Sequence, residues 1–353
     1  MKIAIAAEIA PAKSLIPIIK CLDAEIIGLI HGDGVKTLLE PYCSKLYNIG
    51  HGRKKESEKR SNFKIAYLVL QDIIKAVNAL RGQDIDLLLT CGNAGDVRKG
   101  IAAAKILKIP TLHIEQDIYN PIEMIAFSNL VTVPSHKYKN FLEDRYGLAN
   151  VQVIGGYPMA SYVNMKNLKC VSKVKNPDDF ILMVLGGDIK HEDLPKIIEM
   201  LEYLDRNVLI VPFRFESEFV SNLITSAKLK VLDGYVDLLP LMNESSGMIY
   251  GAGMGLTIEA GVLEIPSIKL AGFHHEHASI DLAHELDIPV LDIEEIPKAI
   301  ENLNKPKSKH LIKNGEKSVS KVVKIINNFD FEKISTSGVS SMRRIWKQRS
   351  KFR

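Results

Sequence analysis

The chain has 353 residues, of which 46% are hydrophobic and 25% are charged, a balance typical of an ordinary soluble globular protein. The length predicts two domains, because single hydrophobic cores stop growing at roughly 250 to 300 residues. The composition excludes a disordered or fibrous protein, and no window of about 18 uncharged apolar residues predicts a transmembrane helix.

The cysteines and the N-terminus indicate a reducing compartment. Four cysteines, at positions 21, 43, 91 and 170, lie far apart without a CxxC or zinc-site spacing. At this chain length they predict free thiols in a cytoplasmic protein rather than a disulfide framework. The N-terminal run MKIAIAAEIAPAKS is interrupted by Glu8 and Pro11, so it predicts a core strand and not a signal peptide.

Strands and helices are predicted to alternate along almost the whole chain, as in α/β folds. In the first half we predict strands at 2–8, 25–31, 86–92, 111–116, 130–135 and 151–155. Between them we predict helices near 13–22, 63–81, 95–108, 121–129 and 136–147. The charged run 51–62 is predicted to be a solvated loop, in which Arg53 remains a candidate for binding an anionic substrate.

The second half repeats this alternation. We predict strands at 180–187, 207–213, 230–235, 247–253, 266–272 and 288–292, and helices near 193–204, 215–227, 237–243, 256–264, 277–286 and 294–304. The continuous Val, Ile and Leu runs indicate parallel sheets covered on both faces. We expect two Rossmann-like, doubly wound domains facing an interdomain cleft. Their expected bounds are 1–155 and 179–328, with a linker at 156–178 and a tail at 329–353.

The tail accounts for the net positive charge. Residues 342–353, MRRIWKQRSKFR, carry six Lys or Arg and no acid, which leaves −2 for the rest of a chain whose net charge is +4. Such a segment, with Trp346 and Phe352 as aromatic anchors, can contact an anionic membrane surface or nucleic acid. The alternative is a terminal helix packed through Ile345 and Trp346. We favour the packed helix, keep peripheral membrane contact as the alternative, and expect no nucleic-acid partner.

Two glycine-rich turns follow strands of the second half: LGGD at 185–188 and GAGMG at 251–255. Ligands of open α/β sheets bind beyond the carboxyl ends of the strands, and glycine lets the backbone approach a diphosphate closely. Either glycine-rich segment could equally be a tight strand-to-helix connection that binds no ligand. Glu259 lies one turn inside the following helix. Its carboxylate can accept hydrogen bonds from ribose hydroxyls. Alternatively, it is an acid that the helix dipole stabilises near the N-terminus, without a ligand.

The run KVLDGYVDLLPLMNESSGMIYGAGMGLTIEAGVLEIPSIKL, residues 230–270, resembles the nucleotide-sugar domain of GT-B proteins. It is most similar to the N-acetylglucosaminyltransferase family that completes lipid II, and next to the UDP-N-acetylglucosamine 2-epimerases. The residues that carry the match are Gly234, Tyr235, Asp237, Met242, Gly251, Gly253, Thr257, Glu259, Ala260 and Pro266. The resemblance implies that 253–257 bind the diphosphate, Glu259 the ribose and 234–236 the uracil edge. It also implies that a helix near 309–326 crosses back toward the first domain.

The first half resembles the same families through GNAGDVRKGIAAAKILKIPTLHIEQD, residues 92–117. Glu115 and Gln116 match the Glu-Gln pair of the transferases, whereas His113 and Glu115 match the spacing of the epimerases. A glutamate that ends a parallel strand is a candidate acid or base, because burial raises its pKa. The candidate catalytic residues are therefore Glu115, Glu8 and His113. The candidate substrate-binding residues are Gly186, Gly187, Tyr235, Gly251, Gly253, Met254, Gly255, Thr257, Glu259, His274 and Gln116.

The chain departs from the transferase pattern in several places. AAEIAPAKS replaces the glycine- and histidine-rich GGTGGH loop, and Glu8 is the nearest substitute for its histidine. Asp188 replaces the serine of GGS, where it would repel a diphosphate, so we expect it to cap the next helix. Tyr250 replaces an arginine. The cluster FHHEHAS, with His274, His275 and His277, occupies the position where polar side chains contact the sugar, and we predict no metal there.

These observations predict a UDP-sugar-dependent glycosyltransferase of GT-B type that needs no cofactor. It would transfer a hexosamine-like sugar to a glycan or lipid-linked acceptor of the cell envelope. The main alternative is a UDP-N-acetylglucosamine 2-epimerase-like enzyme. A non-catalytic sugar-nucleotide-binding protein is the third. We expect a cytoplasmic protein, and membrane association through its tail is kept as an alternative.

Overall fold

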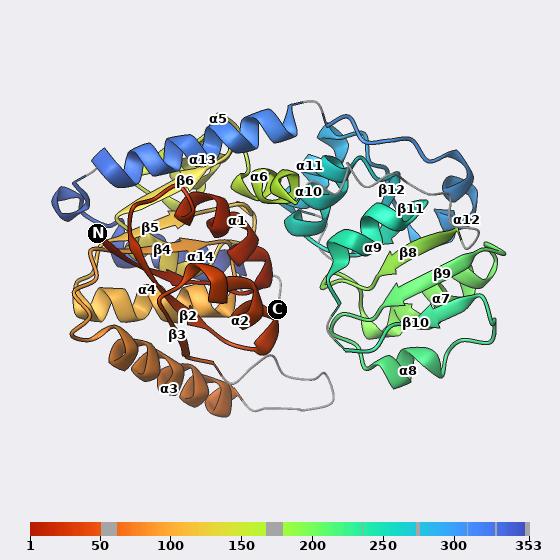
Figure 1. The fold of residues 1–353 in the computed structure, drawn as a ribbon, viewed down its shortest axis with the longest axis horizontal. Helices are drawn as coiled ribbons and strands as arrows, with labels where there is room; N and C mark the ends of the chain where they lie inside the picture. The colour runs from red at the N-terminus through yellow and green to blue at the C-terminus, as the bar shows by residue number, and fades with distance from the viewer. Residues whose placement is uncertain are drawn as a thin grey trace. The chain divides into compact units, whose positions relative to one another are not determined.

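The computed structural model describes residues 1–50, 62–166, 179–234, 236–272, 276–308, 310–328 and 330–349. These residues form two compact units, each built on a parallel sheet (Figure 1). Unit 1 contains the described residues up to Tyr162 and those from Lys313 onward, and unit 2 contains those from Val163 to Ile312. The predicted class of two α/β units, each built on a parallel sheet, is confirmed.

Unit 1 contains a seven-stranded sheet with the order β3-β2-β1-β4-β5-β6-β7, in which every pairing is parallel. Its strands are β1 (Lys2–Ala6), β2 (Glu25–Ile30), β3 (Lys45–Asn48), β4 (Leu87–Cys91), β5 (Thr111–Ile114), β6 (Leu130–Val133) and β7 (Val151–Val153). Residues 3–6 of β1 and all of β4 and β5 are buried, because helices cover both faces of the sheet.

The helices of unit 1 lie on both sides of this sheet. Figure 1 shows α3 and α4 along one side and α13 along the other. The helices are α1 (Ile9–Ile19), α2 (Asp33–Leu39), α3 (Asn62–Leu80), α4 (Gly95–Leu107), α5 (His136–Tyr146), α6 (Pro158–Met165), α13 (Leu311–Asn328) and α14 (Gly338–Arg349), with 3₁₀ turns η1 (Glu40–Tyr42), η2 (Glu123–Phe127) and η7 (Phe331–Lys333).

Local sequence signals set some of these helix ends. The hydroxyl of Ser135 accepts a hydrogen bond from the backbone N–H of Tyr138 and caps the start of α5. The same helix ends at Gly147, whose φ of 65° is the left-handed conformation that glycine adopts without strain. The helix α5 therefore has the bounds that its sequence predicts.

Unit 2 contains a six-stranded parallel sheet with the order β10-β9-β8-β11-β12-β13. Its strands are β8 (Phe180–Val184), β9 (Asn207–Val211), β10 (Leu229–Val231), β11 (Gly247–Tyr250), β12 (Ser267–Leu270) and β13 (Val290–Leu291). Its helices are α7 (Leu194–Glu202), α8 (Ser217–Ser221), α9 (Leu238–Glu244), α10 (Met254–Leu263), α11 (Ala278–Glu285) and α12 (Ile296–Ala299), with 3₁₀ turns η4 (His191–Asp193), η5 (Ile293–Glu295) and η6 (Ile300–Asn302).

One face of the unit 2 sheet carries a continuous apolar core. Side chains of β8, β9, β11 and β12 pack against α7 and α12, and Met183, Ile197 and Ile249 are fully buried there. Burying such side chains stabilises a fold by about 1.5 to 3 kcal/mol each. This core holds the strands in register and so fixes where the loops at their carboxyl ends begin.

Several predicted elements differ from the structure. The edge strand β3 and the helix α2 were not predicted, because KLYN has no continuous apolar run and is only half-buried. The helix expected at 215–227 ends at Ser221, since the Glu202 carboxylate accepts the backbone N–H groups of Thr225 and Ser226 at 2.6 and 3.0 Å. The segment expected at 121–129 is the 3₁₀ turn η2 rather than an α-helix.

The compact units also divide the chain differently from the expected bounds. Helix α6 lies where the sequence suggested the start of a linker. Residues from Lys313 onward, most of α13 among them, belong to unit 1 and not to the second domain. This division by contacts groups most of α13 with unit 1, whereas the expected bounds of the second domain were 179–328.

The basic tail is part of unit 1. Ile345 of α14 is fully buried, and Ser341 donates a hydrogen bond to the carbonyl of Gly147 at 2.7 Å. The guanidinium of Arg349 donates to the carbonyl of Pro121 at 2.9 Å. Trp346, expected to pack beside Ile345, is 50% exposed instead. Among the helices of the described residues, none is long and apolar enough to cross a membrane.

Candidate functional site

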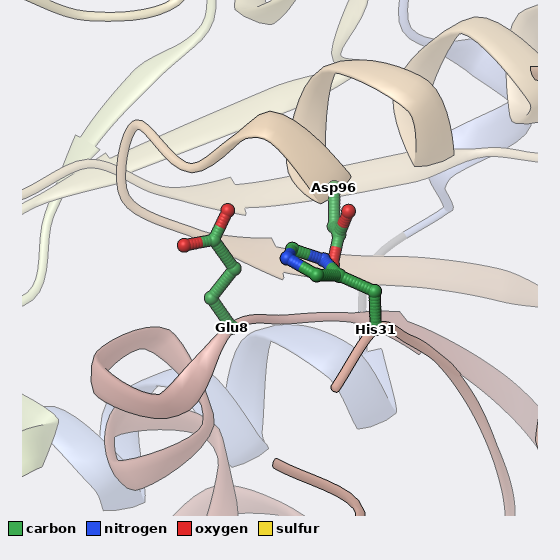
Figure 2. A group of neighbouring side chains, drawn as sticks. All are labelled: Glu8, His31 and Asp96. Carbon is green, nitrogen blue, oxygen red and sulfur yellow. The ribbon is translucent and has the colours of Figure 1, made fainter. Parts of the chain in front are cut away.

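The carboxyl edge of the unit 1 sheet brings three titratable side chains together. Glu8 follows β1, His31 follows β2, and Asp96 lies in the first turn of α4, after β4. Because β1 pairs with both β2 and β4, these strand ends are neighbours. Figure 2 shows the imidazole of His31 between the two carboxylates, and one polar atom from each residue lies within 4.8 Å of the other two.

A short hydrogen bond orients the imidazole. His31 Nδ1 and Asp96 Oδ2 are 2.5 Å apart, and Asp96 is fully buried. This hydrogen bond is the largest cause that raises the pKa of His31, burial opposes it, and the negative charges of Asp96 and Glu8 raise the pKa further. A histidine whose pKa is raised by a carboxylate partner is a candidate general acid or base.

The surrounding charges explain why the imidazolium is favoured. Lys99 Nζ lies 3.2 Å from Asp96 Oδ1 and 2.8 Å from Asp72 Oδ2, so one ammonium is shared by two carboxylates. The backbone N–H of Gly95 donates to Glu8 Oε1 at 3.1 Å. The carboxylates of Glu8, Asp72 and Asp96 outnumber this ammonium, and the negative charges of Glu8 and Asp96 favour the imidazolium although Lys99 opposes it.

The same donor set is of a kind that binds divalent metals. Two carboxylates and an imidazole suit Zn²⁺ or Mn²⁺. However, Lys99 and the Gly95 N–H already engage one oxygen of each carboxylate, and His31 Nδ1 engages Asp96. These contacts favour proton exchange over metal binding.

The two other predicted acid–base residues form a separate, buried group. Glu115 and His113 are both fully buried. The Glu115 carboxylate accepts the backbone N–H groups of Gln116 and Asp117, each at 2.8 Å, and lies 3.3 Å from His113 Nε2. His113 Nδ1 lies 2.8 Å from the hydroxyl of Thr90. These contacts hold the loop after β5 in place, and a catalytic role for either residue stays a prediction.

Gln116 and an unpredicted ion pair complete this edge of unit 1. The side-chain amide of Gln116, expected to bind substrate, donates to the hydroxyl of Ser14 at 2.9 Å inside the unit. Arg98 makes a two-pronged ion pair with Glu123, with N–O distances of 2.5 and 3.1 Å. Burial raises the pKa of Glu123, but the Arg98 guanidinium outweighs it and holds that pKa below its usual value.

The glycines of unit 2 allow two loops to pack against each other. A Cβ atom on Gly186 would lie 2.2 Å from the carbonyl oxygen of Gly251, and one on Gly251 would lie 2.3 Å from the side chain of Ile189. In contrast, a Cβ atom on Gly187 meets no described atom within 4 Å. Loop packing therefore explains Gly186 and Gly251, while Gly187 borders open space.

The predicted diphosphate turn lies at the start of α10. The helix begins at Met254, and its N-cap Gly253 has no side chain to satisfy the first backbone N–H groups of that turn. The Thr257 hydroxyl accepts from the Tyr250 hydroxyl at 3.1 Å. Glu259 is buried, at 3% exposure, and its assignment to the ribose stays a prediction.

Other predictions are placed as follows. Asp188 does not cap the next helical segment, since the N-cap of η4 is Lys190. His277, from the FHHEHAS cluster, caps α11 by accepting the backbone N–H of Ser279 at 3.0 Å. Arg53, Tyr235, His274 and His275 lie outside the described residues.

Sequence reasoning missed His31, Asp96 and Lys99. His31 is the last residue of a predicted strand, and Asp96 opens a predicted helix, so each stood at a strand end where ligands bind. Their convergence depends on β2 and β4 flanking β1, and a strand order of this kind is the signal that would have paired them.

Comparison with known proteins gives structural matches only. No family model matches the chain, and no curated protein is significantly similar in sequence. The structure of a UDP-GlcNAc 2-epimerase from Methanocaldococcus jannaschii has a TM-score of 0.68 at 20% identity, over 93% of this chain and 99% of that one. The corresponding enzyme from Neisseria meningitidis has a TM-score of 0.71 at 15% identity, over 93% and 100%. MurG from Acinetobacter baumannii has a TM-score of 0.51 at 14% identity, over 93% and 99%.

The chain shares with these solved structures a fold of two α/β units with parallel sheets. The expected likeness to both the epimerases and MurG is confirmed at the level of structure. At these identities the likeness concerns the fold, and the choice between epimerase and transferase chemistry has to come from the site.

Proposed function

We propose that the protein is an enzyme that binds a UDP-linked N-acetylhexosamine and inverts one stereocentre of the sugar, as a UDP-N-acetylglucosamine 2-epimerase does. The observation that carries this proposal is the Glu8, His31 and Asp96 cluster at the carboxyl edge of unit 1. The fold supports it, because structures of UDP-GlcNAc 2-epimerases match this chain with TM-scores of 0.68 and 0.71.

Epimerisation needs two proton-transfer groups. One group accepts the proton of the stereocentre on one face of the sugar, and the electron pair of the broken C–H bond expels UDP from the neighbouring carbon as the C–O bond breaks. UDP then adds back while another group returns a proton to the opposite face. The His31 imidazole, fixed by Asp96, and the nearby carboxylate of Glu8 provide such a pair. Their roles exchange in the reverse reaction, so no oxidant or reductant is consumed.

Unit 2 would bind the nucleotide. The backbone N–H groups at the start of α10, which no N-cap side chain engages, suit the diphosphate, because a helix N-terminus attracts anions. Glu259 would accept hydrogen bonds from the ribose hydroxyls. Glu115, His113 and Gln116 would then support the loop after β5 from inside unit 1, through the hydrogen bonds that they make there.

The second candidate is the glycosyltransferase expected from the sequence, with a glycan or lipid-linked acceptor. The structural match with MurG favours it. In that case His31 or Glu8 would take the proton of the acceptor hydroxyl, and the nucleoside diphosphate would leave. A protein that binds sugar nucleotides without turnover is the third candidate, and the basic helix α14 would be its remaining surface for a membrane.

Incubation of the full chain with UDP-N-acetylglucosamine alone tests this order of candidates. We expect a second UDP-sugar to accumulate to an equilibrium ratio, measured by proton NMR at the anomeric position. Turnover that needs an added acceptor would replace the epimerase with the transferase. Tight UDP binding without turnover, with or without acceptors, would leave only the binding protein.

A further inference from the structure

A lysine is buried beneath the glycine loops of unit 2. Lys269, in β12, is 1% exposed. Its ammonium donates a hydrogen bond to the carbonyl of Ala252 at 2.7 Å, lies 3.9 Å from Asp188 Oδ2 and stands 5.5 Å from the ring centre of Tyr250. Burying a charged side chain in a parallel strand costs free energy that burying an apolar residue would not. The burial of Lys269 therefore indicates a role for its charge.

The sheet register places this ammonium under two loops at once. Lys269 pairs with Tyr250 of β11, and Tyr250 pairs with Val184 of β8. All three residues therefore stand at the same level, near the carboxyl ends of adjacent strands. The loop after β8 contains Asp188, and the loop after β11 contains Ala252, so the Lys269 side chain reaches both.

The surrounding backbone is too closely packed to be rearranged easily. The backbone N–H of Asp188 donates to the carbonyl of Gly251 at 3.1 Å. A Cβ atom on Gly272 would lie 2.4 Å from Asp188 Cβ, and one on Gly186 would lie 2.4 Å from Ala252 Cβ. Three loops thus meet around the charge of Lys269 with little free space.

We propose that Lys269 is a positioning residue that prepares the loop 251–253 for the diphosphate of a nucleotide, and that Asp188 competes for its charge. The inference rests on the proposed nucleotide site of unit 2. The hydrogen bond from Lys269 fixes the carbonyl of Ala252 toward the interior of unit 2. Because the N–H and C=O groups of a trans peptide point in opposite directions, the N–H of Gly253 then points away from Lys269.

The ammonium also supplies a positive charge close to an anion at this loop. Its influence is strong because a buried charge is screened less than an exposed one. Asp188, 13% exposed at the side chain, offsets part of this charge in the structure. A bound diphosphate would compete with Asp188 for the charge of Lys269. Asp188 stands where the transferases that the sequence resembles have a serine, and it would lower the affinity for the diphosphate.

Calorimetric titration with UDP, uridine and inorganic pyrophosphate tests the proposal on four chains: the wild type, Lys269→Met, Lys269→Arg and Asp188→Asn. We expect Lys269→Met to weaken UDP and pyrophosphate binding by about 10-fold or more, as for one lost charge-assisted interaction. Uridine affinity should change by less than about twofold. Lys269→Arg should restore most of the loss, and Asp188→Asn should tighten pyrophosphate binding several-fold.

The two variants are expected to change pyrophosphate affinity in opposite directions, which distinguishes this role from simple packing. If Lys269 and Asp188 only held the loops together, both neutral variants would weaken UDP and uridine alike, and that result overturns the proposal. Unchanged UDP affinity in Lys269→Met also overturns it, while the nucleotide site itself would stand. If the wild type binds pyrophosphate in a Lys269-dependent way but binds no UDP, the inference holds and the proposed substrate is wrong. Asp188→Asn keeps the test open if Lys269→Met does not fold.

Discussion

The two units share a sheet plan but equip the same edge with different chemistry. In both units the strand order places the first strand at the centre, with the second on one side and the fourth on the other. At the carboxyl edge of unit 1 the loops carry titratable side chains, namely Glu8, His31 and Asp96. At the same edge of unit 2 the described loops carry glycines, backbone N–H groups and Asp188 above the buried ammonium of Lys269.

This difference indicates that the two units have different chemical roles. Side chains with exchangeable protons are suited to bond breaking, whereas backbone N–H groups bind anions with fixed geometry. The paired loops of unit 2 have little room for side chains, so their ligand contacts would come from the main chain. The comparison therefore predicts that changes in unit 1 affect turnover and that changes in unit 2 affect affinity.

The largest effect is expected at His31. His31→Gln keeps a donor for Asp96 but removes the group that exchanges protons, so turnover of the UDP-sugar should fall by about 10²- to 10⁴-fold. UDP affinity should stay within about twofold, because the nucleotide is assigned to unit 2. Steady-state kinetics and calorimetry provide the measurements. His136→Gln, at an exposed position in unit 1, is the control, and a loss of UDP affinity in His31→Gln would break the comparison.

The next effect concerns Glu259 in unit 2. Glu259→Gln keeps the size of this buried side chain and removes its charge, so UDP should bind about 10- to 150-fold more weakly if the carboxylate accepts ribose hydroxyls. Calorimetry with UDP checks this, and thermal unfolding checks the fold. Glu285→Gln, on the exposed part of α11, serves as the control. Equal UDP affinity in the two variants would show that Glu259 supports only the helix.

Substitutions at two glycines distinguish an effect on loop packing from an effect on ligand binding. Gly251→Ala places a methyl group against Ile189 and should cost about 1 to 3 kcal/mol of unfolding free energy. Gly187→Ala meets no described atom, so its stability should stay within about 0.5 kcal/mol. UDP should nevertheless bind it several-fold more weakly. Chemical denaturation measures the stability of both variants, and calorimetry measures their UDP affinity. Unchanged UDP affinity in Gly187→Ala would show that the diphosphate does not bind beside Gly187.

The smallest effect is a pH dependence of stability in unit 1. The pKa of His31 is raised in the folded chain by its hydrogen bond to Asp96. Its contribution to stability is therefore fully present below the unfolded pKa of about 6.5 and disappears as the pH rises through the folded pKa. The difference in unfolding free energy between wild type and His31→Gln should be larger at acidic than at alkaline pH. A difference that grows with pH would contradict the assigned hydrogen bond.

The sequence was a good guide where one local signal decides the structure. The continuous apolar runs located most strands, and the helix predicted near 136–147 is α5 (His136–Tyr146). It was a poor guide where a distant side chain intervenes. The Glu202 carboxylate accepts backbone N–H groups that a longer α8 would have used, and no pattern within 215–227 announces it.

The candidate site divides in the same way. Glu8 and the glycine turns were predicted because they follow strand ends in the sequence. His31 and Asp96 join Glu8 only through the pairing of β1 with β2 and β4, which brings residues 65 positions apart into hydrogen-bond contact. Glu259 and Glu115 were predicted as site acids, yet their burial could not be inferred from a helical or strand position alone.

The sequence by itself determined two α/β units, the parallel character of their sheets and the glycine loops at their strand ends, because hydrophobic periodicity and glycine placement are local properties of the chain. Only the tertiary structure decided which charges meet. The Glu8, His31 and Asp96 cluster and the contact of Lys269 with Ala252 each join residues that lie 17 or more positions apart. Such contacts depend on strand order and register, and these follow from how whole layers pack rather than from any short stretch of sequence.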